Sequence, residues 1–287
     1  MIRFGDEGMR RELAVLWREC FGDPEEYANL FFDNHPPKKH TLVSLAGECP
    51  VSMLSLLPVT AGKAQGGYIY AVATKPDFRR RGLAGELLRA AERHLKEQGK
   101  SFSVLTPSMP SLYNYYEKYG FYPLFSLGET IVRREKIPTI QDGDIRSLSS
   151  REFFSLRKAA FEKDRLFIAW DENELSYRKK EIALTGGEIL GLCWNQARGA
   201  AVCYPGKEEI LIKELALEEG LAPIQALGLL KRRYSAGYFR LRLPSDYPFP
   251  GGLAVSKAGC ICWYDNQVKE VVLRDKRLQP YMNLVLD

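Results

Sequence analysis

The sequence predicts a mixed α/β protein made of two consecutive units of one fold. Helical and β-rich segments alternate along 287 residues, a length that usually holds more than one domain. The tripeptide Gly-Leu-Ala occurs at residues 82–84 and 220–222, and Pro-Ser follows each copy, 25 and 24 residues after its glycine. The order of segments also starts again near residue 140. We therefore expect an internal repeat, with one unit at residues 1–138 and the other at 139–287.

The first unit opens with two expected helices and a hairpin. Leu13, Leu16 and Trp17 stand at helical spacing within residues 8–20. The next helix is expected to begin at the sequence DPEE, with Asp23 as its N-cap. The β-rich runs TLVSLA and VSMLSLLPV then predict a hairpin, because a short Gly-Glu-Cys-Pro segment separates them.

A central strand, a long helix and a tyrosine-rich helix complete this unit. The run YIYAVAT is apolar on both faces, which is typical of a covered strand. The following helix begins at Leu83 and ends at Gly99, with one apolar stripe along its length. We expect a strand at SFSVLTP, a short helix at SLYNYYEKYG and closing β structure at residues 121–134.

The second unit repeats this order with different chemistry. A helix around Phe153 and another that begins near the sequence DENE precede a hairpin, EILGLCW and AAVCYPG. A central strand, EILIKELAL, a helix, GLAPIQALGLLKRRY, and a strand, YFRLRLP, follow. The two units thus share an order of elements even where their residues differ.

Composition limits the classes of function. Lys and Arg number 41 against 36 Asp and Glu, a formal net charge of +5, which does not indicate a nucleic-acid binder. The six cysteines and three histidines show no metal-binding spacing, so we expect no metal and reduced thiols. Because no apolar run approaches membrane-spanning length, we expect a cytoplasmic protein without a membrane partner.

Three consecutive arginines, Arg79, Arg80 and Arg81, stand directly before the long helix of the first unit. The first turn of a helix has backbone N–H groups without intrahelical partners and a partial positive charge, so it binds anions. Gly82 and Ala84 keep bulky side chains away from that backbone. These residues indicate a phosphate-binding site; a solvated basic turn or a nucleic-acid contact are the other interpretations of this segment.

The segment Arg79-x-x-Gly82-x-Ala84 resembles the signature of GNAT-type N-acetyltransferases, and YYEKYGF resembles the second signature of that family. The resemblance spans residues 69–121 and implies acetyl-CoA as the cosubstrate, with its pyrophosphate at the start of the helix. It implies the following cofactor-binding residues: Val72, Ala73, Thr74, Arg79, Arg80, Arg81, Gly82, Leu83, Ala84 and Gly85. It also implies that the central strand and the strand after the helix diverge to admit the pantetheine arm.

Tyr116 matches the tyrosine of the second signature, which implies that it is the general acid that protonates the leaving thiolate. The other interpretation is an aromatic helix face, since Tyr113, Tyr115 and Tyr119 lie in the same segment. A backbone N–H of Val72 or Ala73 is expected to bind the carbonyl oxygen. Met109 departs from the family pattern, because many related sequences have a cofactor-contacting Asn there.

The acceptor is expected to be a primary amine on a small molecule or a peptide. Such an amine is protonated at neutral pH and must lose a proton before it attacks. Asp33 and Glu129 are candidate bases, although a surface role suits each better. Direct transfer in a ternary complex, which the resemblance implies, needs no nucleophile such as Cys49. The sequence leaves self-association and the identity of the amine open.

The second unit is expected to have lost the cofactor, because Leu217, Glu218 and Glu219 stand where the first unit has arginines. This tandem arrangement resembles the enhanced-intracellular-survival type of acetyltransferase, in which the terminal carboxylate can reach the active site. The terminal Asp287 is accordingly a candidate proton acceptor, or else the end of a strand in solvent. Two other functions remain open: an acyl-CoA-binding regulator without turnover, and a tandem-fold aminoacyl transferase.

Overall fold

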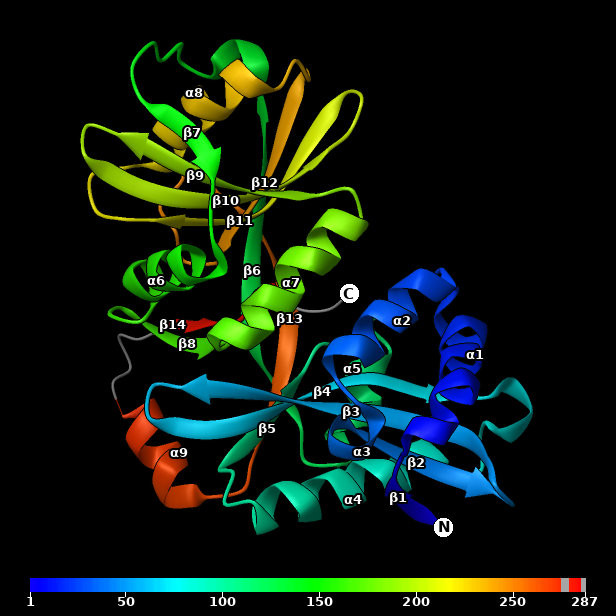
Figure 1. The fold of residues 1–287 in the computed structure, drawn as a ribbon. Helices are drawn as coiled ribbons and strands as arrows, with labels where there is room; N and C mark the ends of the chain where they lie inside the picture. The colour runs from blue at the N-terminus through cyan, green and yellow to red at the C-terminus, as the bar shows by residue number, and fades with distance from the viewer. Residues whose placement is uncertain (275–278, 285–287) are drawn as a thin grey trace. The chain divides into compact units, whose positions relative to one another are not determined.

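The computed structural model describes residues 1–274 and 279–284. The chain separates into two compact units. Among the described residues, the first unit contains 1–123 and 259–272, and the second contains 124–258, 273–274 and 279–284. Both combine helices with a mixed sheet, which confirms the mixed α/β class that the sequence predicts (Figure 1).

The sheet of the first unit has the strand order β1-β2-β3-β4-β5-β13. Its strands are β1 (Ile2–Phe4), β2 (Thr41–Ala46), β3 (Cys49–Ala61), β4 (Ala64–Thr74), β5 (Phe102–Leu105) and the end of β13 (Ala254–Trp263). The strands β2, β3 and β4 pair antiparallel, and β4 and β5 pair parallel. The helix α4 (Leu83–Glu97) connects β4 to β5, as a parallel pair requires a crossover.

Helices cover both faces of this sheet (Figure 1). One face packs against α4, whose Leu87, Ala91 and Leu95 share a buried cluster with Leu54 and Ile69. The other face meets α1 (Arg10–Phe21) and α2 (Glu25–Asn34), where the ring of Trp17 contacts those of Phe31 and Tyr70. Since Ile69 and Tyr70 are adjacent in β4, their side chains point to opposite faces, and the strand is buried on both.

The second unit repeats this architecture. Its sheet has the order β6-β12-β11-β10-β9-β7. The strands are β6 (Tyr122–Arg133), β7 (Asp144–Ser147), β9 (Glu188–Trp194), β10 (Ala197–Pro205), β11 (Glu209–Leu217) and β12 (Tyr238–Pro244). The helices are α6 (Ser150–Phe161), α7 (Glu172–Leu184) and α8 (Pro223–Arg233), and a further parallel pair joins β8 (Arg165–Ala169) to β14 (Gln279–Tyr281). Here α8 connects the parallel strands β11 and β12, as α4 connects β4 and β5.

Each unit contains a strand from the other half of the sequence. Residues 127–133 of β6 pair with β12 in the second unit, and residues 260–263 of β13 pair with β5 in the first. The helix α9 (Asn266–Leu273) follows β13 and belongs mostly to the first unit. The compact units are therefore discontinuous and differ from the contiguous segments 1–138 and 139–287 expected from the sequence, because these two strands cross between the units.

One expected helix cap is wrong. Asp23 does not cap α2; its carboxylate accepts a hydrogen bond of 2.8 Å from the indole N–H of Trp17, and Pro24 occupies the N-cap position without a side-chain bond. The aromatic cluster competes successfully for the carboxylate because a buried indole N–H needs an acceptor. In the second unit, α7 begins at the sequence DENE as expected, and Asp171 caps it by accepting from the backbone N–H of Glu174 at 2.8 Å. Within the described residues, no helix is long and apolar enough to cross a membrane.

Candidate functional site

The candidate site begins where β4 and β5 stop pairing. Their parallel register runs only from Gly66 to Tyr68 on β4, opposite residues 102–104. A register shift against β3 follows, and Ala71 adopts a left-handed conformation with φ of 51°. Such a bulge removes a residue from the ladder and redirects the strand. The last residues of β4, Val72 to Thr74, thus extend beyond the paired part of β5, as the resemblance implied.

The arginine segment folds back against the end of β4. Arg79 donates from Nε to the carbonyl oxygen of Thr74 at 3.1 Å, and Arg81 donates to the carbonyl oxygen of Asp77 at 2.8 Å. The side chain of Arg81 also lies over the ring of Phe78. Arg80 has a positive φ of 62° and is exposed. All three arginines are exposed, and backbone carbonyl oxygens of the same segment orient the side chains of Arg79 and Arg81.

The start of α4 offers free backbone donors beside these arginines. Gly82 is the N-cap residue with φ of 83°, a left-handed conformation that glycine adopts without a Cβ penalty. The first helical bond runs from the N–H of Glu86 to the carbonyl oxygen of Gly82 at 3.0 Å. The N–H groups of residues 83–85 precede it and have no intrahelical acceptor. Arginine donors and helix amides therefore meet in one continuous segment that suits a pyrophosphate.

Gly85 has a packing role that the sequence did not reveal. A Cβ atom at this position would lie 2.0 Å from the hydroxyl oxygen of Tyr119 and 2.6 Å from its Cζ. Gly85 is buried, and the guanidinium of Arg89 lies over the ring of Tyr119. The missing side chain thus admits the Tyr119 ring, while the backbone N–H of Gly85 still belongs to the start of α4.

We expect Gly85→Ala to lower the free energy of unfolding by about 1–3 kcal/mol, because Tyr119 must leave its position in a packed cluster. Chemical denaturation measures this change. Gly85→Ala combined with Tyr119→Ala is the matched control, since the second change removes the clashing ring. If Gly85→Ala costs the same free energy with and without the Tyr119 ring, the contact does not account for the effect.

Tyr116 lies on α5 (Leu112–Glu117), between β5 and β6 in the sequence. Its side chain is 7% exposed and shares a buried cluster with Leu105, Phe121 and Cys260. Burial, with a smaller contribution from the thiol of Cys260, raises the pKa of Tyr116 to about 12. The phenol therefore keeps its proton at neutral pH. A protonated phenol is what a general acid needs, although a buried aromatic core residue would have the same property.

The end of β13 supports this tyrosine helix from the far end of the sequence. Cys262 donates from its thiol to the carbonyl oxygen of Tyr119 at 3.9 Å, and Tyr264 donates to Ser103 on β5 at 2.6 Å. The indole of Trp263 donates to the hydroxyl of Tyr122 at 3.0 Å. Sequence reasoning missed these residues; the apolar run CICW after a glycine was the signal that could have predicted a strand here.

Residues 1–124 match the model of a family described as an acetyltransferase (GNAT) domain. The matched segment includes β4, the arginine loop, the start of α4 and the tyrosine helix. This matched part, which is less than half of the 287 residues, is similar to a GNAT acetyltransferase domain. A comparison with curated proteins finds no match.

Solved structures show that this chain has a tandem GNAT fold over more than nine-tenths of its residues. A probable N-acyltransferase from Enterococcus faecalis has 15% sequence identity and a TM-score of 0.77, over 93% of this chain and 73% of that one. Eis1 from Mycobacterium abscessus has 12% identity and a TM-score of 0.68, over 93% and 75%. A tandem GNAT protein from the clavulanic acid pathway has 12% identity and a TM-score of 0.56, over 92% and 98%.

The second GNAT-like unit has a different helix start. A proline, Pro223, occupies the first helical position of α8 and has no N–H to donate. The N–H groups of Gln225 and Ala226 both donate to the carbonyl oxygen of Ala222 at 3.1 Å. Glu219 is exposed beside this helix start, in the wall of a cavity of about 620 Å³. Compared with the start of α4, the start of α8 therefore offers an anion fewer free backbone N–H groups and adds the negative charge of Glu219.

The parallel strands of the second unit also diverge, but the region beyond them contains a buried ion pair. The paired register of β11 and β12 ends at Ile212, and the next residues are Lys213 and Glu214. Glu214 accepts from Nε and Nη2 of Arg157 at 2.7 and 3.1 Å, and both side chains are almost fully buried. The hydroxyl of Tyr281 donates to the same carboxylate at 3.2 Å. Protein side chains thus satisfy one another in this region, whereas no such buried ion pair is found among the described residues of the first unit.

The candidate proton acceptors have partners of their own. Asp33 forms an ion pair with Arg10 at 2.6 Å, and Glu129 binds Arg240 at 2.7 Å and Arg242 at 3.4 Å. These ion pairs favour a structural role for both carboxylates. Met109, which departs from the family pattern, is exposed. Asp287, the other candidate proton acceptor, lies outside the described residues.

Proposed function

We propose that the protein is an acetyl-CoA-dependent N-acetyltransferase that transfers the acetyl group directly to a primary amine. The observation that carries this proposal is the single segment in which a diverging strand, exposed arginines and free helix amides follow one another, beside a buried and protonated Tyr116. Acetyl-CoA supplies the acetyl thioester. The match of residues 1–124 to an acetyltransferase domain supports the same class of reaction.

Each group has a distinct task in this proposal. The amides of residues 83–85 and the guanidinium of Arg80 bind the pyrophosphate. A backbone N–H of Val72 or Ala73, at the end of β4, donates to the thioester carbonyl oxygen as negative charge develops there. Tyr116 gives its proton to the thiolate that leaves, so the amide bond forms as the carbon–sulfur bond breaks. The amine attacks in its neutral form, so it binds deprotonated or gives its proton to a base or to water before the attack.

The principal alternative is a regulator that binds acyl-CoA without turnover. Both functions use the same phosphate-binding segment, so binding alone does not distinguish them. The decisive experiment incubates the purified protein with acetyl-CoA and a mixed panel of polyamines, amino acids, aminoglycosides and peptides. Acetylated products detected by mass spectrometry support the transferase. Binding of acetyl-CoA without any acetylated product supports the regulator. A parallel incubation replaces acetyl-CoA by charged tRNA, and a product formed only there supports an aminoacyl transferase.

We expect one acetyl-CoA per chain, because only α4 of the two corresponding helices combines free amides with arginines. Arg80→Ala should weaken binding by about tenfold to a hundredfold, the loss expected for one charge-assisted contact. Arg93→Ala, an exposed arginine farther along α4, is the control and should leave the affinity unchanged. Isothermal titration calorimetry measures both. Two equivalent sites, or equal losses for Arg80→Ala and Arg93→Ala, would show that the start of α4 is not the site.

A further inference from the structure

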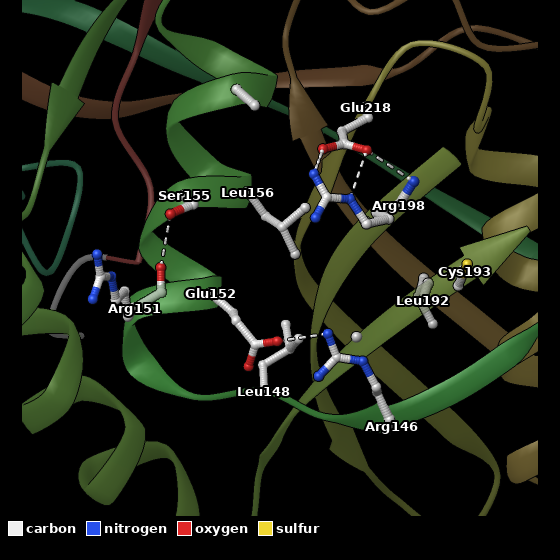
Figure 2. A pocket seen from close by; sticks show the side chains of 13 residues that line it. Arg146, Leu148, Arg151, Glu152, Ser155, Leu156, Leu192, Cys193, Arg198 and Glu218 are labelled. Carbon is white, nitrogen blue, oxygen red and sulfur yellow. Dashed lines mark hydrogen bonds and ion pairs between the residues drawn. The ribbon is translucent and has the colours of Figure 1, made fainter. Parts of the chain in front are cut away.

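The second unit contains a separate cavity of about 520 Å³ between α6 and the strands β9 and β10 (Figure 2). This volume suits a small molecule. Leucines form its apolar part: Leu148 and Leu156 from the segment that contains the start of α6, and Leu192 from β9, all nearly buried. All the residues that line the cavity belong to the second unit, and none of them belongs to the cofactor segment described above.

Two ion pairs stand in the walls of this cavity, with Leu156 between them (Figure 2). Arg146 on β7 binds Glu152 on α6 at 2.6 Å, and Arg198 on β10 binds Glu218 at 2.7 Å. The side chains of Arg146 and Arg198 are 58% and 63% exposed. Each guanidinium is therefore held by a carboxylate and still accessible to a ligand.

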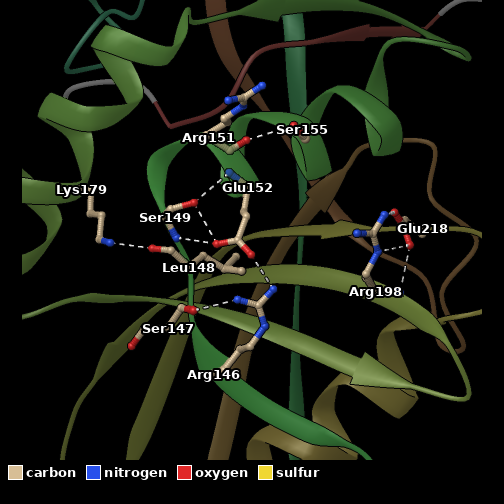
Figure 3. Close-up of polar contacts among 10 residues, drawn as sticks. All are labelled: Arg146, Ser147, Leu148, Ser149, Arg151, Glu152, Ser155, Lys179, Arg198 and Glu218. Carbon is tan, nitrogen blue, oxygen red and sulfur yellow. Dashed lines mark hydrogen bonds and ion pairs between the residues drawn. The ribbon is translucent and has the colours of Figure 1, made fainter.

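The glutamates use their acceptor capacity within the protein (Figure 3). One oxygen of Glu152 accepts from Arg146, and the other accepts from the backbone N–H of Ser149 at 2.9 Å and from its hydroxyl at 2.8 Å. Glu218 accepts from the backbone N–H, Nε and Nη2 of Arg198. These bonds orient the two arginines and leave few carboxylate lone pairs for a ligand.

The polar groups of these two ion pairs that remain available to a ligand are mainly hydrogen-bond donors. Arg198 directs Nε and Nη2 at Glu218, so its Nη1 has no acceptor among the described residues. Arg146 uses Nη2 for Glu152 and makes one longer bond of 3.3 Å from Nη1 to the carbonyl oxygen of Ser147. A guanidinium has five N–H donors, so both arginines retain free ones. Donors near two walls and leucines between them favour a ligand with two anionic ends and an apolar middle.

We propose that this cavity binds a small linear dicarboxylate, with one carboxylate at Arg146 and the other at Arg198. The aliphatic chain of the ligand then covers Leu156 and Leu192. Bidentate pairing of a carboxylate with a guanidinium gives the orientation, and burial of the chain adds affinity. The site uses no residue of the first unit, so its residues differ from those proposed to bind acetyl-CoA.

The test compares adipate with hexanoate, two six-carbon chains that differ by one carboxylate, in calorimetric titrations at constant ionic strength and without acetyl-CoA. We expect adipate to bind at least about tenfold more tightly, the effect of one charge-assisted contact. Arg146→Met and Arg198→Met should each abolish this difference. Arg151→Met is the matched control: this arginine lines the same cavity, but its guanidinium points away from the two ion pairs in Figure 2, so the preference should persist.

A second measurement locates the ligand. Cys193 lines the cavity and is half-buried, whereas Cys49 is exposed in the first unit. Adipate should slow alkylation of Cys193 and leave Cys49 unaffected. The proposal is overturned if adipate does not bind, if hexanoate binds equally well, or if the preference survives both Arg146→Met and Arg198→Met. In that case the Arg146–Glu152 pair serves only to attach α6 to β7, and the Arg198–Glu218 pair only joins β10 to the residue after β11.

Discussion

Replacing Tyr116 by Phe should lower turnover by about 10² to 10⁴ and leave acetyl-CoA affinity nearly unchanged. The range is that of a lost, positioned proton donor. Phe keeps the ring in its buried cluster with Leu105 and Phe121, so the fold should be preserved. Steady-state kinetics with the amine found in the product screen give turnover, and calorimetry gives the affinity.

Tyr113→Phe is the matched control for this experiment. Tyr113 lies on the same helix, and burial together with Cys260 raises its pKa to about 12, as for Tyr116. A phenol that only packs should tolerate the change, so turnover should fall little. Unchanged turnover in Tyr116→Phe, or equal losses in both variants, would assign the proton to water or another group.

The pH profile provides a further check on the same role. An acid must be protonated to act, and its contribution disappears as the pH rises through its pKa. With a pKa of about 12, Tyr116 stays protonated from neutral pH to about pH 11. In this interval the wild-type rate should therefore not fall through loss of the Tyr116 proton. Any fall that the wild type shows there should also be present in Tyr116→Phe. A loss near pH 10 that disappears in the variant would contradict the buried environment of this phenol.

A fragment of residues 1–138 should not fold cooperatively by itself. It lacks the strand residues 260–263, which pair with β5, and two of these residues, Cys260 and Ile261, are fully buried. Without them, β5 becomes an open edge and the cluster around Tyr116 is exposed to water. Circular dichroism during thermal unfolding should show a broad, non-cooperative change, and acetyl-CoA should not bind.

The control for this experiment supplies the missing strand. Residues 1–123 joined by a flexible Gly-Ser linker to residues 259–272 contain the main segments of the first compact unit. This variant should unfold more cooperatively than the 1–138 fragment and regain acetyl-CoA binding. Cooperative unfolding of 1–138 with normal acetyl-CoA affinity would show that β13 is dispensable for the GNAT domain.

The phosphate-binding segment could be predicted from the sequence because its parts are contiguous. Residues 72–85 form the end of a strand, a loop and the first turn of a helix, and local rules connect each residue type to its position. The glycine at the N-cap and the arginines before it therefore indicate an anion site without any knowledge of distant contacts. The roles of these residues in binding acetyl-CoA stay predictions, as does that of Tyr116.

The internal repeat was equally visible, because both units have the same order of segments and similar spacing around the Gly-Leu-Ala tripeptides. Structural comparison confirms two GNAT-like units. The altered charge at Glu218 and Glu219 was also visible. The structure adds that Arg198 binds Glu218. The difference in anion binding expected between the starts of α4 and α8 therefore depends on Pro223 and Glu219 as well.

Only the tertiary structure decided which strands complete each unit. Periodicity predicts a strand but not its partner, and Cys262 contacts Tyr119 across 143 residues of sequence. The same holds for Gly85, whose missing side chain makes room for Tyr119, and for Asp23, which binds Trp17 instead of capping its helix. The sequence by itself determined the local chemistry of the phosphate-binding segment. Packing between distant residues determined the surroundings of Tyr116 and the cavity of the second unit, because such contacts depend on chain topology, which local patterns do not specify.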